Sequence, residues 1–196
     1  MWIALALLTS DDGGLEARAR EAMDASIDRT RMVLTSNDLN ETERRVRLRA
    51  EAEAMTDYAE LTRRAADNQW SVMTPVQRQR FQRALHTLLI EAHLSSFDSF
   101  DPRYSLRSVG AELHGHNEAW VDLELTGLRF FPLRFGFLLN NELRVVDARL
   151  GSFRLVDHLR ETVDRVVAIQ GIERPLQQLE RKAESARRQG QRSSSR

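Results

Sequence analysis

The chain of 196 residues contains no cysteine, four prolines and a single lysine, Lys182. The absence of cysteine excludes disulfide bonds, thiolate nucleophiles and cysteine-ligated zinc, so stability must come from burial of apolar surface. The 29 Lys and Arg residues are balanced by 29 Asp and Glu residues, which gives a formal net charge of zero. Such a chain lacks the positive field that holds nucleic acid, and we expect no nucleic-acid partner.

Long apolar runs are also scarce. The run from Trp2 to Leu8 is too short to span a membrane, which takes about 20 residues, and it resembles the apolar part of a secretory signal without its basic flank. We therefore expect a signal-like or disordered N-terminus over residues 1–13. Residues 14–186 are long enough for one well-cored domain, and residues 187–196 are polar enough to form a disordered tail.

The first half of the chain carries apolar residues at helical spacing. A first helix is predicted from Gly13 to about Ser36, and a second, charge-dense helix from Glu41 to Ala54, which continues or restarts toward Trp70. Thr74 is a natural N-cap, and Pro75 suits the first helical position because its missing N–H is not needed there. The helix that follows has one apolar stripe, made of Phe81, Ala84, Leu85, Leu88, Leu89 and Ala92.

After Pro102 the apolar period changes from 3.6 to 2, which predicts an antiparallel sheet. Four strands are expected, at residues 104–109, 121–125, 131–139 and 143–148, with a tight turn at Asn140 and Asn141. Ser152 is a candidate cap for a helix that ends at Gly171, and Pro175 opens a last short helix. The pattern predicts an α+β fold in which a curved sheet of about four strands packs against a helical layer, an NTF2-like cone.

The sequence offers candidates for a metal site and for a catalytic site. His114 and His116 stand two residues apart with only glutamates nearby, so we expect a surface turn and no metal site. Cone-shaped folds also host ketosteroid-isomerase-like chemistry, which needs a carboxylate base and an acid donor inside the pocket.

The candidate bases for such chemistry are Asp122, Glu124 and Asp147, and the candidate donors are Tyr58 and Tyr104. Asp122 and Glu124 alternate out of phase with the apolar residues of their strand, and Asp147 shares the outer phase of the last predicted strand with Arg149. All three carboxylates are therefore expected on the face opposite the pocket, and no enzyme is predicted.

The run from Trp70 to Phe81, followed by Leu88 and Leu89, resembles the helix signature of the MlaC-type phospholipid-binding proteins, also called toluene-tolerance proteins. The downstream part resembles the same family in order and spacing, through a strand and two helices carrying Asp147, Gly151, Ser152, Phe153, Arg160, Gly171, Ile172, Leu176, Leu179 and Lys182. The likeness extends over roughly residues 15–182.

The resemblance implies a periplasmic phospholipid carrier without a cofactor, which serves an inner-membrane ABC transporter with an MCE-type component and moves phospholipid between the inner and outer membranes. An outer-membrane complex is a second candidate partner, and we expect a monomer. Two alternatives stay open: an isomerase-like enzyme in the same fold, and an adaptor whose helical half binds a partner.

Periodicity alone cannot tell whether the sheet and the helix stripe close into a packed core or leave a cavity between them. For a carrier, the expected ligand-binding residues are Met55, Tyr58, Leu85, Leu89, Leu123, Phe135, Phe137 and Val146. Arg80 and Arg83 lie off the apolar stripe of their helix, and they are the expected partner-binding residues.

Overall fold

The computed structural model describes residues 12–99, 101, 105–126, 133–139 and 142–193. These residues confirm the predicted α+β class, with helices packed against one antiparallel sheet. The helices are α1 (Asp12–Thr35), α2 (Glu41–Met55), α3 (Tyr58–Trp70), α4 (Pro75–Ser96), the 3₁₀ turn η1 (Phe97–Ser99), α5 (Leu155–Gln170) and α6 (Glu173–Ser193). The strands are β1 (Ser105–His114), β2 (Glu118–Thr126), β3 (Leu133–Leu139), β4 (Leu143–Leu150) and β5 (Phe153–Arg154).

Side-chain caps fix where the helices begin. Thr74 accepts a hydrogen bond from the backbone N–H of Gln77, whose side chain accepts one from Thr74 in return, with Pro75 at the first helical position. Asn40 and Glu43 form the same reciprocal capping box at α2. The predicted second helix restarts, because Thr56 leaves the helical conformation and pairs with Val145 of the sheet.

The sheet is a meander in which neighbouring strands follow the order of the chain, β1-β2-β3-β4-β5. The two-residue β5 is an addition to the predicted set of about four strands. Irregularities interrupt the register between Ser108 and Gly110 on β1 and between Gly136 and Phe137, where β3 pairs with β4. At the second one Phe135 pairs with Ala148 while Phe137 pairs with Val145, so β4 carries an extra residue and its alternation breaks. The predicted Asn140–Asn141 turn and Tyr104 lie outside the described residues.

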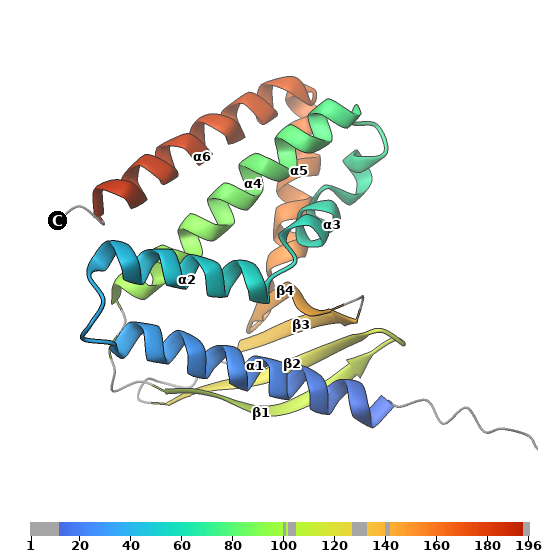
Figure 1. The fold of residues 1–196 in the computed structure, drawn as a ribbon. Coiled ribbons are helices and arrows are strands. Elements are labelled where there is room, and N and C mark those ends of the chain that lie inside the picture. The colour runs from blue at the N-terminus through green and yellow to red at the C-terminus, as the bar shows by residue number, and fades with distance from the viewer. Residues whose placement is uncertain (1–11, 100, 102–104, 127–132, 140–141, 194–196) are drawn as a thin grey trace, which may run out of the picture.

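Figure 1 shows α1 lying along the sheet. Helices α2 to α6 lie above α1 and the sheet in this view. One apolar cluster joins Leu15, Ala19 and Met23 of α1 to Val121 and Leu123 of β2. A second cluster holds α3, α4, α5 and α6 together, and a third joins α2 to α4. The polar phase of β2 is as predicted, since Ala119, Val121 and Leu123 are buried and Asp122 is not.

Asp147 was expected on the outer face of the sheet. This prediction is wrong, because the side chain is fully buried. It pairs with Arg154 at 2.6 Å and accepts the backbone N–H of Val156 at 3.1 Å, in the first turn of α5. Ser152 was the predicted cap, but α5 begins at Leu155 after Arg154, whose side chain makes no capping bond. The carboxylate of Asp147 thus satisfies the helix start from the neighbouring strand.

The C-terminal helix is longer than the sequence suggested. The chain stays helical through Ser193, past the start of the tail expected at residue 187. Gly190 lies so close to Glu91 and Arg45 that a Cβ atom there would collide with both side chains, so this part of α6 is packed against α4 and α2. Residues 1–11 of the predicted N-terminal segment lie outside the described residues. No helix within the described ranges is both long and apolar enough to cross a membrane.

Candidate functional site

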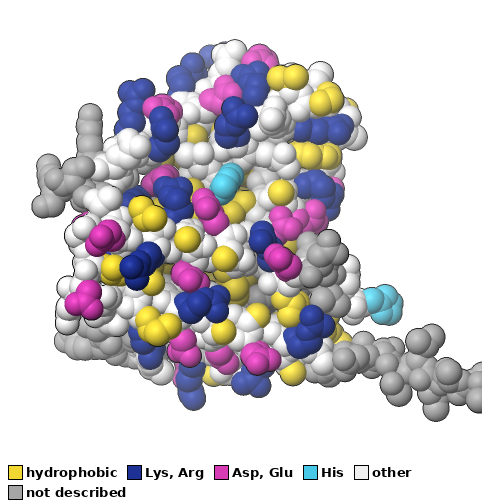
Figure 2. Space-filling model, in the orientation of Figure 1, with side chains coloured by type: hydrophobic (Ala, Val, Ile, Leu, Met, Phe, Trp, Pro, Cys, Tyr) yellow, Lys and Arg dark blue, Asp and Glu magenta, His cyan; other side chains and the backbone are white. Residues whose placement is uncertain are grey.

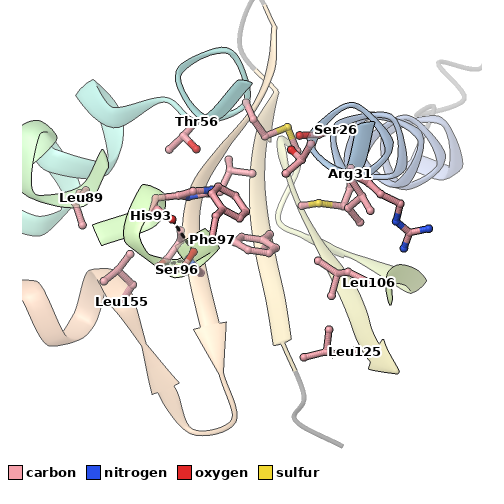
Figure 3. Close-up of a pocket in the computed structure, with 18 of the residues that line it drawn as sticks. Ser26, Arg31, Thr56, Leu89, His93, Ser96, Phe97, Leu106, Leu125 and Leu155 are labelled. Carbon is pink, nitrogen blue, oxygen red and sulfur yellow. Dashed lines mark hydrogen bonds between the residues drawn. The ribbon is translucent and has the colours of Figure 1, made fainter. Parts of the chain in front are cut away.

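A cavity of about 540 Å³ lies between the sheet and the helices. It is open to the outside rather than sealed, and its volume falls in the range of about 300–1,000 Å³ that is common for ligand pockets. Side chains from α1, α4 and the strands converge on it in Figure 3, where Leu89 and Leu155 lie on one side of His93 and Phe97 and Leu106 and Leu125 lie on the other. Its walls are predominantly apolar.

The cavity occupies the place where two apolar clusters fail to close on each other. The cluster between α1 and the sheet and the cluster between α2 and α4 each have partly buried apolar side chains at their margins. Seven of these marginal side chains line the cavity: Ile27, Leu34, Met55, Leu89, Phe97, Leu106 and Phe135. An apolar side chain that is half exposed to an interior space is a ready contact for an apolar ligand, because filling the space removes further apolar surface from water.

Four of the eight predicted ligand-binding residues line this cavity. Met55 lies at the end of α2, Tyr58 at the start of α3, Leu89 on α4 and Phe135 on β3. They come from distant parts of the sequence, and the structure brings them together around one space. They remain our proposed ligand contacts.

The other four predicted residues are placed differently. Leu123 is packed against α1 in the first cluster, and Leu85 is packed with Phe81 and Leu176 in the second. Val146 is fully buried, and it is not among the residues that line the cavity. The side chain of Phe137 lies outside the described residues.

Helix α1 contributes a wall of the cavity that was not predicted from the sequence. Met23, Ile27, Thr30 and Leu34 recur at intervals of three and four, so they share one helix face, and all four line the cavity. The apolar stripe of α1 was visible in the sequence. What the sequence did not show is that the first half of this stripe packs against the sheet while the second half borders a space.

Among the described residues of the cavity, Tyr58 and Asp147 do not form the acid–base pair that an isomerase-like site requires. Burial raises the pKa of Tyr58 to about 12, which makes its hydroxyl a weaker acid, and its ring stacks on His86 with centroids 4.6 Å apart. Asp147 borders the cavity, but its carboxylate is occupied by Arg154 and by backbone N–H groups. Partial desolvation also lowers the pKa of His93, whose ring tilts against Phe97 (Figure 3).

The predicted partner-binding arginines lie on α4, away from the cavity. The guanidinium of Arg80 pairs with Glu180 and with Glu173, each at 2.8 Å, and thereby links α4 to α6. These carboxylates raise the pKa of Arg80 further above its ordinary value. Arg83 is exposed one turn further along the helix. Arg80 therefore contributes to packing of α6, whereas Arg83 projects to the outside.

The remaining sequence candidates concern metals. His114 ends β1 and His116 lies in the turn before β2, and both are exposed. Within the described part of the chain, no group of three or more histidine and carboxylate side chains gathers as metal ligands would. This turn is a short surface connection between paired strands, with Gly115 at a positive φ of 73°.

Comparisons with known proteins place this architecture. The sequence model of the family described as MlaC protein matches residues 21–181. The structure is similar to that of a phospholipid-binding protein from Ralstonia solanacearum that was solved in complex with a phospholipid. The TM-score is 0.74 at 16% sequence identity, and the match covers 86% of this chain and 98% of the other. A search of curated proteins found no match.

Proposed function

The chain belongs to the MlaC family, and we propose that it is a carrier that holds the acyl chains of a phospholipid in the cavity between α1, α4 and the sheet. The observation that carries this proposal is the open apolar cavity whose walls are the unclosed margins of two core clusters. The phospholipid bound to the similar Ralstonia solanacearum protein supports the choice of ligand class.

The energetics define what such a carrier must provide. Each CH₂ group removed from water contributes about 0.8 kcal/mol, so two acyl chains exposed to water would cost on the order of 20 kcal/mol or more. Half-buried side chains such as Leu89 and Phe135 provide an apolar surface that can offset this cost. Binding of this kind depends on the chains more than on the headgroup, because apolar contacts carry most of the free energy.

We propose that the protein acts in the periplasm and exchanges its lipid with an inner-membrane ABC complex that contains an MCE-type component. An outer-membrane complex is a second proposed partner. The role is binding and transfer, without bond making or breaking. The occupied carboxylate of Asp147 and the raised pKa of Tyr58 are consistent with this role.

The function is tested by native mass spectrometry of the full chain purified from Gram-negative cells, followed by lipid extraction. We expect the protein to carry phospholipid in a stoichiometric complex, and the mass difference to disappear after denaturation. An enzyme or an adaptor would be isolated without lipid, and protein that carries none even after incubation with phospholipid vesicles would contradict the carrier proposal.

Docking to a membrane complex requires surface groups that are free to form new contacts. Figure 2 shows cationic and anionic side chains intermixed over one face of the molecule, so no broad field of one sign steers docking from that side. Arg83 is exposed, and its charge acts on Glu180 without forming a close ion pair among the described residues. We propose it as a partner contact in preference to Arg80, whose reversal would place a carboxylate beside Glu173 and Glu180.

Replacing Arg83 by glutamate is expected to slow lipid transfer to a reconstituted MCE-containing complex about two- to fivefold at low salt, and less as salt screens the contact. Arg165→Glu is the matched control, because Arg165 is also an exposed helical arginine but lies on α5. Transfer is followed with a fluorescent phospholipid. Equal slowing by both variants would indicate an effect of net charge and would remove Arg83 from the docking surface.

A further inference from the structure

The polar groups around the cavity differ in whether other parts of the chain already occupy them. Asp147 is paired with Arg154, and Ser96 donates a hydrogen bond to the backbone carbonyl of His93. Among the described residues that line the cavity, Arg31 is the one that carries a guanidinium or ammonium group. It is therefore the permanent positive charge of this wall.

Arg31 lies where an apolar wall meets solvent. It follows Ile27 by one helical turn and precedes Leu34 by three residues, and both of these side chains line the cavity. Arg31 lines it too but is exposed. In Figure 3 its guanidinium extends from α1 away from Leu89, His93 and Leu155. The apolar stem thus borders the cavity while the charged end is at its rim.

The guanidinium has no structural partner among the described residues, in contrast to Arg20 and Arg29 of the same helix. Arg29 pairs with Glu51 at 2.7 Å, and Arg20 donates to the Ser108 hydroxyl at 3.5 Å. Arg31 is also not in the last turn of α1, which contains no basic residue, so a helix-dipole contact does not explain it. Its donors are available to a ligand.

We propose that Arg31 binds the phosphodiester of the phospholipid whose acyl chains lie in the cavity, which sets the orientation of the lipid and favours a phosphate-bearing headgroup over an uncharged one. This inference rests on the proposed carrier function. An amphiphile with its chains in the apolar space must leave its polar group where the cavity meets water, and Arg31 is the cation at that boundary. The planar guanidinium donates two parallel N–H bonds to phosphate oxygens, a geometry that a lysine ammonium does not offer.

The test compares three probes on the full chain: phosphatidylglycerol, a diacylglycerol with the same acyl chains, and glycerol 3-phosphate without chains. Their affinities are measured by displacement of a fluorescent fatty acid for the wild type, Arg31→Gln, Arg31→Lys and Arg18→Gln. Arg18 is the matched control, since it is exposed on α1 and is not among the residues that line the cavity.

Arg31→Gln is expected to weaken phosphatidylglycerol binding about three- to tenfold, because the contact is charge-assisted but exposed, and to leave diacylglycerol binding unchanged. Arg31→Lys is expected to recover part of the loss, and Arg18→Gln to behave as wild type. The wild-type preference for phosphatidylglycerol over diacylglycerol should fall as salt rises.

Three results would overturn the assignment. If Arg31→Gln weakened the binding of both lipids equally, the residue would support the cavity wall without contacting the phosphate. The same loss of phosphatidylglycerol affinity in Arg18→Gln would show that the effect comes from net charge. Tight binding of glycerol 3-phosphate would show that the site binds a phosphate without acyl chains. Failure of the wild type to bind either lipid is a separate outcome, because it contradicts the carrier function itself and this inference with it.

Discussion

Replacing Ala148 by tryptophan is expected to abolish lipid retention while leaving a folded protein. Ala148 is a small residue of β4 that lines the cavity opposite Phe135 in the register, so a tryptophan there projects into open space. Tryptophan is well accepted in strands, and a cavity accommodates volume that a packed core does not. The measurements are the amount of co-purified phospholipid and the Tm of the lipid-free protein.

The matched control is Leu123→Trp, which enlarges a side chain that is only 2% exposed and packed against α1. Overfilling this position is expected to destabilise the protein by about 1–3 kcal/mol. The two variants should therefore differ. Ala148→Trp should lose bound lipid, and Leu123→Trp should lose stability. If Ala148→Trp kept its full complement of lipid, the cavity between α1, α4 and the sheet would not be the binding site.

Replacing Glu91 by alanine is expected to reduce the free energy of unfolding by about 3–5 kcal/mol, the usual cost of removing one partner from a buried ion pair. Glu91 of α4 is 5% exposed and accepts hydrogen bonds from both Arg45, at 2.6 Å, and Arg49 of α2. Its removal leaves the Arg45 side chain, itself only 12% exposed, without a carboxylate in the interior. The same carboxylate lies beside Gly190, so the contact with the end of α6 would also loosen.

Urea denaturation of lipid-free protein measures this effect. Glu41→Ala is the control, because Glu41 pairs with Arg44 at the surface of the same helix as Arg45, and its loss should cost less than about 1 kcal/mol. Similar unfolding midpoints for the two variants would show that desolvation of Glu91 cancels its attraction to the arginines. The pair would then contribute nothing to stability, contrary to the prediction.

Local signals were sufficient to predict most of the fold. The Thr74–Pro75 helix start, the period-two strands after residue 104 and the end of α5 at Gly171, with φ of 68°, all lie where the sequence indicated. Each depends on interactions among residues close in sequence, which is why a single chain reveals them. The length of α6 was missed, because its polar C-terminal end is held by Glu91 and Arg45, far away in the sequence.

The cavity was only partly predictable, for a physical reason. Leu85 and Leu89 share one apolar stripe, yet one is packed against α6 and the other borders the space. Hydrophobic periodicity predicts that a residue is buried. It does not predict whether another side chain or a ligand contacts that residue. On β4 strict alternation also failed, because the extra residue at the bulge allows Val145 and Ala148, three apart, to line the same cavity.

The order of the strands has a consequence for how the molecule acquires its shape. Every strand pairs with its neighbour in sequence, so the sheet assembles through short loop closures, which are entropically cheap and fast. Helix α1 is different, because it ends at Thr35 and packs on strands that begin only at Ser105. Its docking on the sheet is a long-range event of folding, as is the packing of α6 on α4. Since α1 supplies one wall of the cavity, the interior becomes enclosed only when this helix meets strands that are synthesised much later.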